Sequence, residues 1–285
     1  MKLNIISALI IFLAIFMWQC TERIEVEVDN TYTRLVVEGY VTTDTTAHTV
    51  KLSLSGDYFA NKPADRISNA VVMIDDGEEL VELTESETEP GLYLTDRDYY
   101  GVPGRTYTLL ISQVDVDGDG VNEEYTAESI LHPVAPMDSI GLELLESPHF
   151  KIYQVLVYAW DPPETNWYAF RVYRNNTLLT DTLNELVVQN DEFFNGNYTY
   201  GIPSQFLDQE EEGEALAVGD TVIFELNGIT EEYYQHIVEA QSEVFYQTPM
   251  FSGPPANITS NISNGALGFF TAYSIERAST VLEQE

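Results

Sequence analysis

The chain has 285 residues, of which 44% are hydrophobic and 12% aromatic, a composition typical of a folded protein. Its 47 acidic residues outnumber 12 basic ones, which gives a formal net charge of −35. Because a strongly negative surface repels phosphate groups, the composition excludes nucleic acid and anionic lipid head groups as partners and favours cations.

The first element along the chain is a short apolar segment. Lys2 is followed by an almost wholly apolar run over residues 3–18, the pattern of a secretory signal peptide. A membrane-spanning helix needs roughly 20 apolar residues, so this run is too short for a comfortable permanent anchor. The only cysteine, Cys20, ends the run, where a lipoprotein signal peptidase would leave an acylated N-terminus. We therefore predict a signal peptide over 1–19, lipid attachment at Cys20 and an acidic tether over 20–33.

Two alternatives to acylation remain open for this segment. Met17, Trp18 and Gln19 stand where the peptidase prefers small side chains, so the run could also be an uncleaved short anchor or an ordinary secretory signal with a chance cysteine behind it. If Cys20 is acylated, no thiol is left for a disulfide, although exported domains often use them. Several acyl chains would anchor the protein stably without a membrane-spanning segment.

Residues 34–131 read as short strands separated by turns. Hydrophobic and polar residues alternate with a period of two, which is typical of strands with one buried face. About seven strands in about 100 residues favour an immunoglobulin-like or transthyretin-like β-sandwich. The predicted strands cover residues 35–41, 49–54, 70–74, 79–83, 91–94, 106–114 and 123–130.

A proline-rich segment over residues 132–138 follows this region. Pro133 and Pro136 lack amide donors and impose extended backbone, which is typical of a linker. A chain of this length is also at the size where single hydrophobic cores stop growing. We therefore predict a second domain over residues 139–285.

The second domain is predicted to be β-rich with one helix, over about residues 230–246. Thr230 is a plausible N-cap, Glu231 and Glu232 suit the first turn, and an apolar stripe recurs at helical spacing. The fold class is therefore mainly β, with an N-terminal sandwich followed by a β-rich domain that carries this helix. Predicted strands lie at 140–145, 152–160, 167–173, 178–182, 221–226 and 266–275.

A proline- and glycine-rich loop over residues 247–257 precedes the last strand. Long loops of this composition are often functional. The apolar and rigid residues there are candidates for a binding loop. These candidates are Met250, Phe251, Pro254 and Pro255.

The strongest local motif starts at Asp115 and reproduces the Asp-x-Asp-x-Asp-Gly start of a calcium loop. Oxygen ligands at alternate positions can wrap one ion. Thr126 stands at position twelve in place of the usual bidentate Glu, so a hairpin variant of the site is expected. The alternative is an acidic hairpin tip in which the aspartates serve turn geometry. The candidate calcium ligands are Asp115, Asp117, Asp119, Val121 (through its carbonyl), Glu123 and Glu124.

Catalytic motifs are absent from the sequence. The four histidines lack metal-ligand spacing, and no nucleophile–base pair is apparent. We therefore predict a protein that is not an enzyme, with a hydrolase as a less favoured alternative. Trp160, Trp167 and Tyr168 beside Pro162-Pro163 could form a stacking platform for glycans, although burial in the core is the more frequent role of such residues.

Four segments together resemble a known family. They are residues 35–41, 50–53, 101–107 and 261–270. Their order and spacing are similar to those of Bacteroidota lipoproteins known as the domain of unknown function 4249 family, over nearly the whole mature chain. The resemblance implies an outer-membrane lipoprotein, surface-facing and often encoded beside a TonB-dependent receptor, with no known catalytic residues.

These observations lead to two functional hypotheses. The first is a surface-exposed, non-enzymatic accessory of a TonB-dependent nutrient transporter, held on the outer membrane by acyl chains on Cys20. The second is a free-standing adhesive module that binds glycans or proteins. Calcium is the one cofactor that the sequence predicts.

Overall fold

The structure is a computed structural model of the chain and describes residues 33–56, 63–211, 213–245 and 258–284. Residues Thr33–Glu285 form one compact unit. The predicted signal peptide and Cys20 lie outside the described residues, as do the binding-loop candidates Met250, Phe251, Pro254 and Pro255. No helix within the described ranges is long and apolar enough to cross a membrane.

The described residues are mainly β, with one helix, α2 (Glu231–Phe245), which confirms the predicted fold class. The immunoglobulin- or transthyretin-like type of the N-terminal part stays a prediction. The strands are β1 (Leu35–Thr42), β2 (Thr49–Leu54), β3 (Val71–Asp75), β4 (Leu80–Glu82), β5 (Thr84–Glu85), β6 (Leu92–Leu94), β7 (Thr106–Val114), β8 (Glu123–Ile130), β9 (Met137–Ser147), β10 (Phe150–Ala159), β11 (Trp167–Arg174), β12 (Thr177–Leu178), β13 (Val187–Asn190), β14 (Ile202–Asp208), β15 (Thr221–Ile229) and β16 (Leu267–Val281).

Three sheets organise these strands. The largest has the order β12-β11-β15-β16-β1-β2-β6-β5, with β13 also paired to β11. A sheet of order β4-β3-β7-β8 and another of order β14-β10-β9 complete the set. The large sheet therefore contains strands from both halves of the chain.

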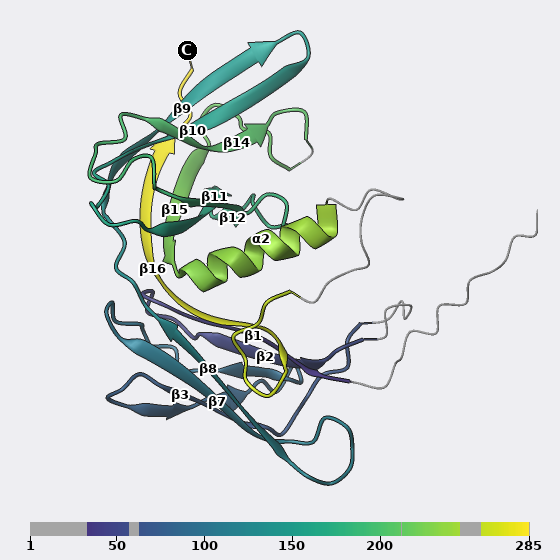
Figure 1. The fold of residues 1–285 in the computed structure, drawn as a ribbon. Helices are drawn as coiled ribbons and strands as arrows, with labels where there is room; N and C mark the ends of the chain where they lie inside the picture. The colour runs from purple at the N-terminus through teal and green to yellow at the C-terminus, as the bar shows by residue number, and fades with distance from the viewer. Residues whose placement is uncertain (1–32, 57–62, 212, 246–257, 285) are drawn as a thin grey trace, which may run out of the picture. The chain divides into compact units, whose positions relative to one another are not determined.

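The last strand, β16, joins the two halves of the large sheet. Its first part pairs in parallel with β1, with Val37 opposite Gly268. Its second part pairs antiparallel with β15, with Glu225 opposite Arg277. In Figure 1 this long yellow strand curves from β1 to the side of β15.

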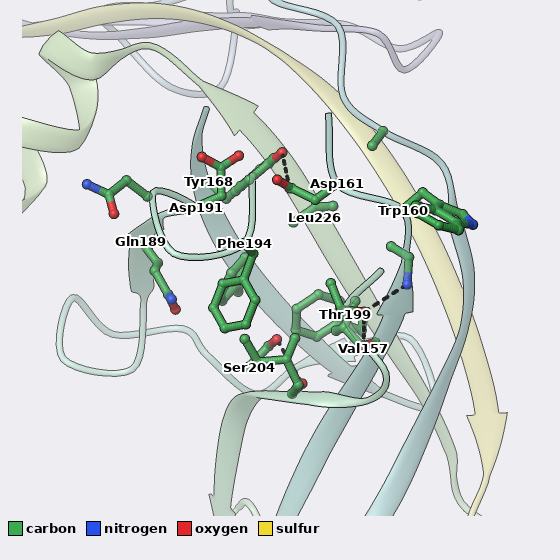
Figure 2. Close-up of a pocket in the computed structure, with 16 residues that line it drawn as sticks. Val157, Trp160, Asp161, Tyr168, Gln189, Asp191, Phe194, Thr199, Ser204 and Leu226 are labelled. Atoms are coloured by element: carbon green, nitrogen blue, oxygen red, sulfur yellow. Dashed lines mark hydrogen bonds between the residues drawn. The ribbon is translucent and has the colours of Figure 1, made fainter. Parts of the chain in front are cut away.

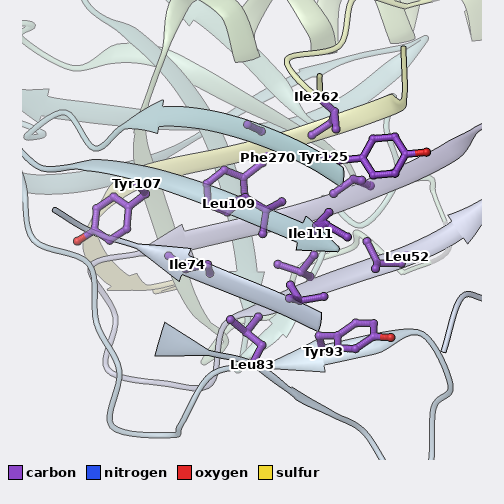
Figure 3. Packing of buried hydrophobic residues seen from close by; sticks show 14 of the residues in the cluster. Leu52, Ile74, Leu83, Tyr93, Tyr107, Leu109, Ile111, Tyr125, Ile262 and Phe270 are labelled. Atoms are coloured by element: carbon purple, nitrogen blue, oxygen red, sulfur yellow. The ribbon is translucent and has the colours of Figure 1, made fainter. Parts of the chain in front are cut away.

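Two hydrophobic cores lie on this sheet. The first packs β1 and β2 against β3, β7 and β8 and includes the fully buried Leu109 and Tyr107. Phe270 of β16 enters the same core, as Figure 3 shows. The second packs β11 and β15 against β9, β10 and β14 around Phe224 and Val155. The first core therefore requires the C-terminal strand, while the predicted division into two domains at 132–138 stays a prediction.

The helix begins as its N-cap predicts. The backbone N–H of Tyr233 donates to Oγ1 of Thr230 at 3.2 Å, which satisfies one of the free amides of the first turn. Ile237 and Ala240 are its buried residues, and the helix contacts β11, β13 and β16. It therefore covers one face of the large sheet.

Several strands differ from those predicted. β13 and β14 were not predicted, because their burial is mixed and their alternation is weak. The predicted strand at 178–182 is wrong beyond Leu178, where the chain turns away after the two residues of β12. β16 extends to Val281 because β15 supplies pairing partners for its polar end.

Candidate functional site

The predicted calcium ligands lie at the exposed turn between β7 and β8. Single carboxylate oxygens of Asp115, Asp117 and Asp119 lie within 4.8 Å of one another. These three side chains also accept hydrogen bonds from backbone N–H groups of their own loop. Asp115 accepts two of these bonds, from Gly118 at 2.7 Å and from Gly120 at 2.9 Å. The loop thus fits both a cation site and a self-capped acidic turn, and calcium binding stays a prediction.

The remaining predicted ligands are arranged less favourably. Glu123 accepts the backbone N–H of Val116 at 3.2 Å, so it lies against the start of the loop. Glu124 follows on β8 with an exposed side chain, and Val121 is 63% exposed. The structure does not bring Glu124 into the group formed by the three aspartates.

A second candidate site lies just after β10 and β13 and just before β14. Trp160 follows β10 and is 64% exposed, so it does not belong to the core. Its ring centroid is 5.4 Å from that of Tyr198, which meets Tyr200 edge-on at 4.9 Å. Tyr200 is 81% exposed. Trp160, Tyr198 and Tyr200 are called the aromatic platform below.

The other two predicted platform residues have different positions. Tyr168 is buried in the second core, and its hydroxyl donates to Oδ1 of Asp161 at 3.4 Å. Trp167 packs with α2 residues on the opposite face of β11. Since side chains alternate along a strand, neighbouring residues 167 and 168 cannot share one platform.

The backbone positions the platform. Trp160 and Tyr198 form an antiparallel bridge between their chain segments. Tyr200 has a φ of 51° and Gly201 a φ of 83°, and this left-handed conformation is unusual for an aromatic residue. A Cβ on Gly201 would lie 2.7 Å from the Tyr158 ring. Strained backbone of this kind is often kept where it aims a functional side chain.

A pair of carboxyl groups lies beside the platform. The carboxyl groups of Asp161 and Asp191 line the same cavity and lie near the Tyr168 hydroxyl in Figure 2. Oδ1 of Asp191 accepts the backbone N–H of Asn166 at 2.8 Å. Within the described residues, Oδ2 of each aspartate has no donor. Two carboxylates are acceptors only, so a proton shared between them supplies the missing donor.

The electrostatics agree with a shared proton. Burial, and next the negative charge of Asp191, raise the pKa of Asp161 to about 7. Burial likewise raises the pKa of Tyr168, which stays a neutral donor. At neutral pH Asp161 is therefore partly protonated.

The cavity beside this pair has a volume of about 70 Å³. It is bounded by apolar residues of the second core, among them Phe170 and Phe224, and by Phe194 of the loop after β13. Because a water molecule needs roughly 10–15 Å³ by this measure, the cavity holds only a few waters. A ligand as large as a sugar ring would lie outside it, on the aromatic platform.

Sequence reasoning missed Asp191, Tyr198 and Tyr200. The two tyrosines flank Thr199 and follow a polar, glycine-containing segment, Asn195-Gly196-Asn197. This part of the sequence shows little of the alternation that predicts a strand. Their contact with Trp160 depends on a bridge between residues 38 positions apart, and no local pattern reports such a pairing.

The family of this chain follows from comparison of sequences. A family described as "Domain of unknown function (DUF4249)" matches residues 21–279. The chain belongs to this family. The matched range includes both hydrophobic cores, the Asp115 loop, the aromatic platform and the Asp161–Asp191 pair, so all of them lie within the DUF4249 domain. Among curated proteins, none matches the sequence.

Proposed function

We propose that this DUF4249 protein is a non-enzymatic binding protein that holds a neutral glycan on the aromatic platform. The observation that carries the proposal is the exposure of Trp160, which packs on Tyr198 instead of entering the core. Grouped exposed aromatic side chains are typical of interaction surfaces. The C–H faces of a sugar ring pack well on aromatic rings, whose polar edges still contact water.

The surroundings of the platform support a neutral carbohydrate. Asp138 lies close enough to the Tyr198 phenol to raise its pKa, and the exposed Asn197 lies in the same segment. Carboxylate and amide groups provide acceptors and donors for sugar hydroxyls. An anionic glycan would be repelled by a chain of net charge −35.

Binding fits the geometry better than hydrolysis does. Glycoside hydrolases hold two carboxyl groups about 5 Å or more apart, so that a sugar or a water lies between them. Asp161 and Asp191 line a cavity that holds only a few waters, so no sugar ring fits between them. We infer that this pair positions the platform and takes no part in catalysis.

The setting of this binding protein is also part of the proposal. The apolar run before Cys20 supports export and acylation, which would place the domain on the outer membrane, facing the cell surface. There it would serve as an accessory of a TonB-dependent transporter. Calcium at Asp115, Asp117 and Asp119 would add a local structural ion to the same protein.

The ligand is tested by isothermal titration with soluble neutral polysaccharides: a β-glucan, a xylan, a mannan and a galactan. We expect one of them to bind, and Trp160→Ala or Tyr200→Ala to weaken binding about tenfold, equivalent to about 1.4 kcal/mol. The matched control is Tyr100→Ala, which removes a 55% exposed tyrosine outside the platform. Binding that is equally strong in all three variants, or absent from the whole panel, would refute the proposal.

The setting is tested separately in the native cell. Palmitate labelling should disappear in Cys20→Ser, and the tagged wild-type protein should co-purify with a TonB-dependent receptor. A labelled Cys20→Ser variant would contradict acylation at this residue. Recovery of no such receptor would contradict the accessory role and leave glycan binding unaffected.

A further inference from the structure

A second, larger cavity lies on the other face of β11. It has a volume of about 600 Å³ and is called the α2 cleft below. One wall is α2, with Tyr233, His236 and Ile237. The other is the outer face of β2, β1 and β16, including Tyr40 and Phe269. The size is that of a pocket for a small molecule.

The residues around the cleft are held in place by hydrogen bonds. The Gln241 side chain of α2 donates to the carbonyls of Leu183 and Leu186 at 2.8 Å each, and both leucines line the cleft. Nδ1 of His236 lies 2.6 Å from the carbonyl of Thr259. The His236 ring also packs on Phe269 at 4.9 Å. The cleft is thus a built feature of the fold.

A positively charged side chain, that of Arg171, lines this cleft. Its strand neighbours Phe170 and Val172 enter the second core on the opposite face, so alternation directs Arg171 toward the helix side. Its pairing partner across the sheet is Glu225. Glu225 is only 2% exposed and binds the guanidinium of Arg277 at 2.7 Å.

Arg171 itself has no salt bridge among the described residues. Burial lowers the pKa of Arg171, but the nearby Tyr273 phenol and Glu225 carboxyl outweigh it and raise this pKa. The other cation of the cleft, Lys51, is paired with Glu38 at 2.8 Å. Because Glu225 already binds Arg277, the N–H donors of Arg171 remain able to bind a carboxylate of a ligand.

Phenol hydroxyls lie near Arg171 in the same cleft. Tyr233 and Tyr273 line the cleft, and both act on the charge of Arg171. Burial raises the pKa of both phenols, so they remain neutral and able to donate. A carboxylate bound to Arg171 can therefore accept hydrogen bonds from them as well.

We propose that the α2 cleft binds an organic monocarboxylate, with its carboxylate on Arg171 and Tyr273 and its apolar body against Phe269, Ile237 and Leu183. The planar guanidinium matches the two oxygens of a carboxylate. One arginine neutralises one negative charge, whereas a phosphate carries close to two. The site is distinct from the aromatic platform because Arg171 and Phe170 lie on opposite faces of β11.

The proposal is tested by isothermal titration of the full chain with 2-naphthoate and decanoate, each beside its neutral amide. We expect at least one acid to bind, and at least tenfold more tightly than its amide. Arg171→Gln should abolish that preference, while Tyr273→Phe should weaken binding of the acid several-fold. The matched control is Arg174→Gln on the same strand, whose side chain binds the carbonyl of Ala215 and which should bind like the wild type.

Folding of each variant is checked by its cooperative thermal transition without ligand. Arg171→Gln leaves Glu225 paired with Arg277, so we expect it to fold. If it does not fold, Tyr273→Phe decides the question. Equal affinity for acid and amide, no binding of either acid, or unchanged affinity in folded Arg171→Gln and Tyr273→Phe would overturn the proposal. Phenyl phosphate binding more tightly than both acids would overturn the choice of a carboxylate.

Discussion

The carboxyl groups of Asp161 and Asp191 line one cavity beside the Tyr168 hydroxyl, although the two residues come from separate strand ends. Asp161 follows Trp160 directly, and Asp191 begins the loop that leads to Tyr198. The carbonyl of Asp191 also accepts the backbone N–H of Phe194 at 2.6 Å. A shared proton therefore links the two chain segments that carry the aromatic platform.

The first prediction concerns the pH dependence of stability. The pKa of Asp161 is about 7 in the folded protein and about 3.9 in an unfolded chain. Between about pH 4 and pH 7 the folded state holds a proton that the unfolded state has released, so stability falls as pH rises through this interval. Above pH 7 the whole of this stability has been lost. A pKa difference of about 3 between the folded and the unfolded state corresponds to about 4 kcal/mol of stability. Solvent screening at this partly open site reduces the expected loss to about 1 kcal/mol.

Asp161→Asn should remove this dependence, because an amide can donate to Asp191 at every pH. We expect the variant to be more stable than the wild type by about 1 kcal/mol at pH 8 and close to it at pH 5. Thermal melts between pH 5 and pH 8.5 measure the difference. Asp98→Asn, at an exposed site, is the control. A difference in stability between Asp161→Asn and the wild type that stays constant over this pH range would contradict the shared proton.

The second prediction concerns the contact between β16 and β1. Gly268 has a φ of 87°, and a Cβ there would lie 2.0 Å from the carbonyl oxygen of Val37. Gly268→Ala should therefore destabilise the protein by about 4 kcal/mol or more, or prevent folding. Gly265→Ala is the matched control, since its φ is 71° and no atom lies within 4 Å of a Cβ. Urea denaturation should show a loss of only about 1–2 kcal/mol there.

The third prediction concerns the buried charge of Glu225. Arg277 binds Glu225, which is 2% exposed, at 2.7 Å, and also binds Asp44 at 2.6 Å. Arg277→Met would leave a buried carboxylate without its partner and should reduce the free energy of unfolding by about 3–5 kcal/mol. Lys51→Met breaks the exposed pair with Glu38 and should lose at most about 1 kcal/mol. Equal losses in the two variants would show that burial of Glu225 is unimportant.

The fourth prediction concerns calcium. Carboxylate oxygens of Asp115, Asp117 and Asp119 lie close enough to hold one ion, and we expect a weak site with a Kd of about 10⁻⁴–10⁻³ M. Calcium should raise the melting temperature of the wild type and not that of Asp117→Asn. Asp75→Asn, in another acidic turn, is the control. If titration to millimolar calcium gives no heat of binding and no shift in melting temperature, the calcium prediction is wrong and the loop is a self-capped acidic turn.

Local patterns were sufficient to predict much of the secondary structure. The helix could be predicted because its N-cap at Thr230 and its apolar stripe lie within one short window. Strands such as β1 and β7 alternate between buried and less buried positions over most of their length, and this alternation is visible in the amino-acid order. The Asp115 motif was also visible, because its three carboxylates lie within five positions.

The sequence by itself therefore determined the β-rich class, the helix Glu231–Phe245 and the acidic loop, since each depends on neighbours along the chain. Only the tertiary structure decided that β16 pairs with β1 and completes the first core through Phe270. It also decided that Tyr198 reaches Trp160, and that Arg171 faces the α2 cleft without a salt bridge among the described residues. The physical reason is that strand pairing is chosen by burial and backbone hydrogen bonding over the whole chain, and residues far apart in sequence carry no local signal of that choice.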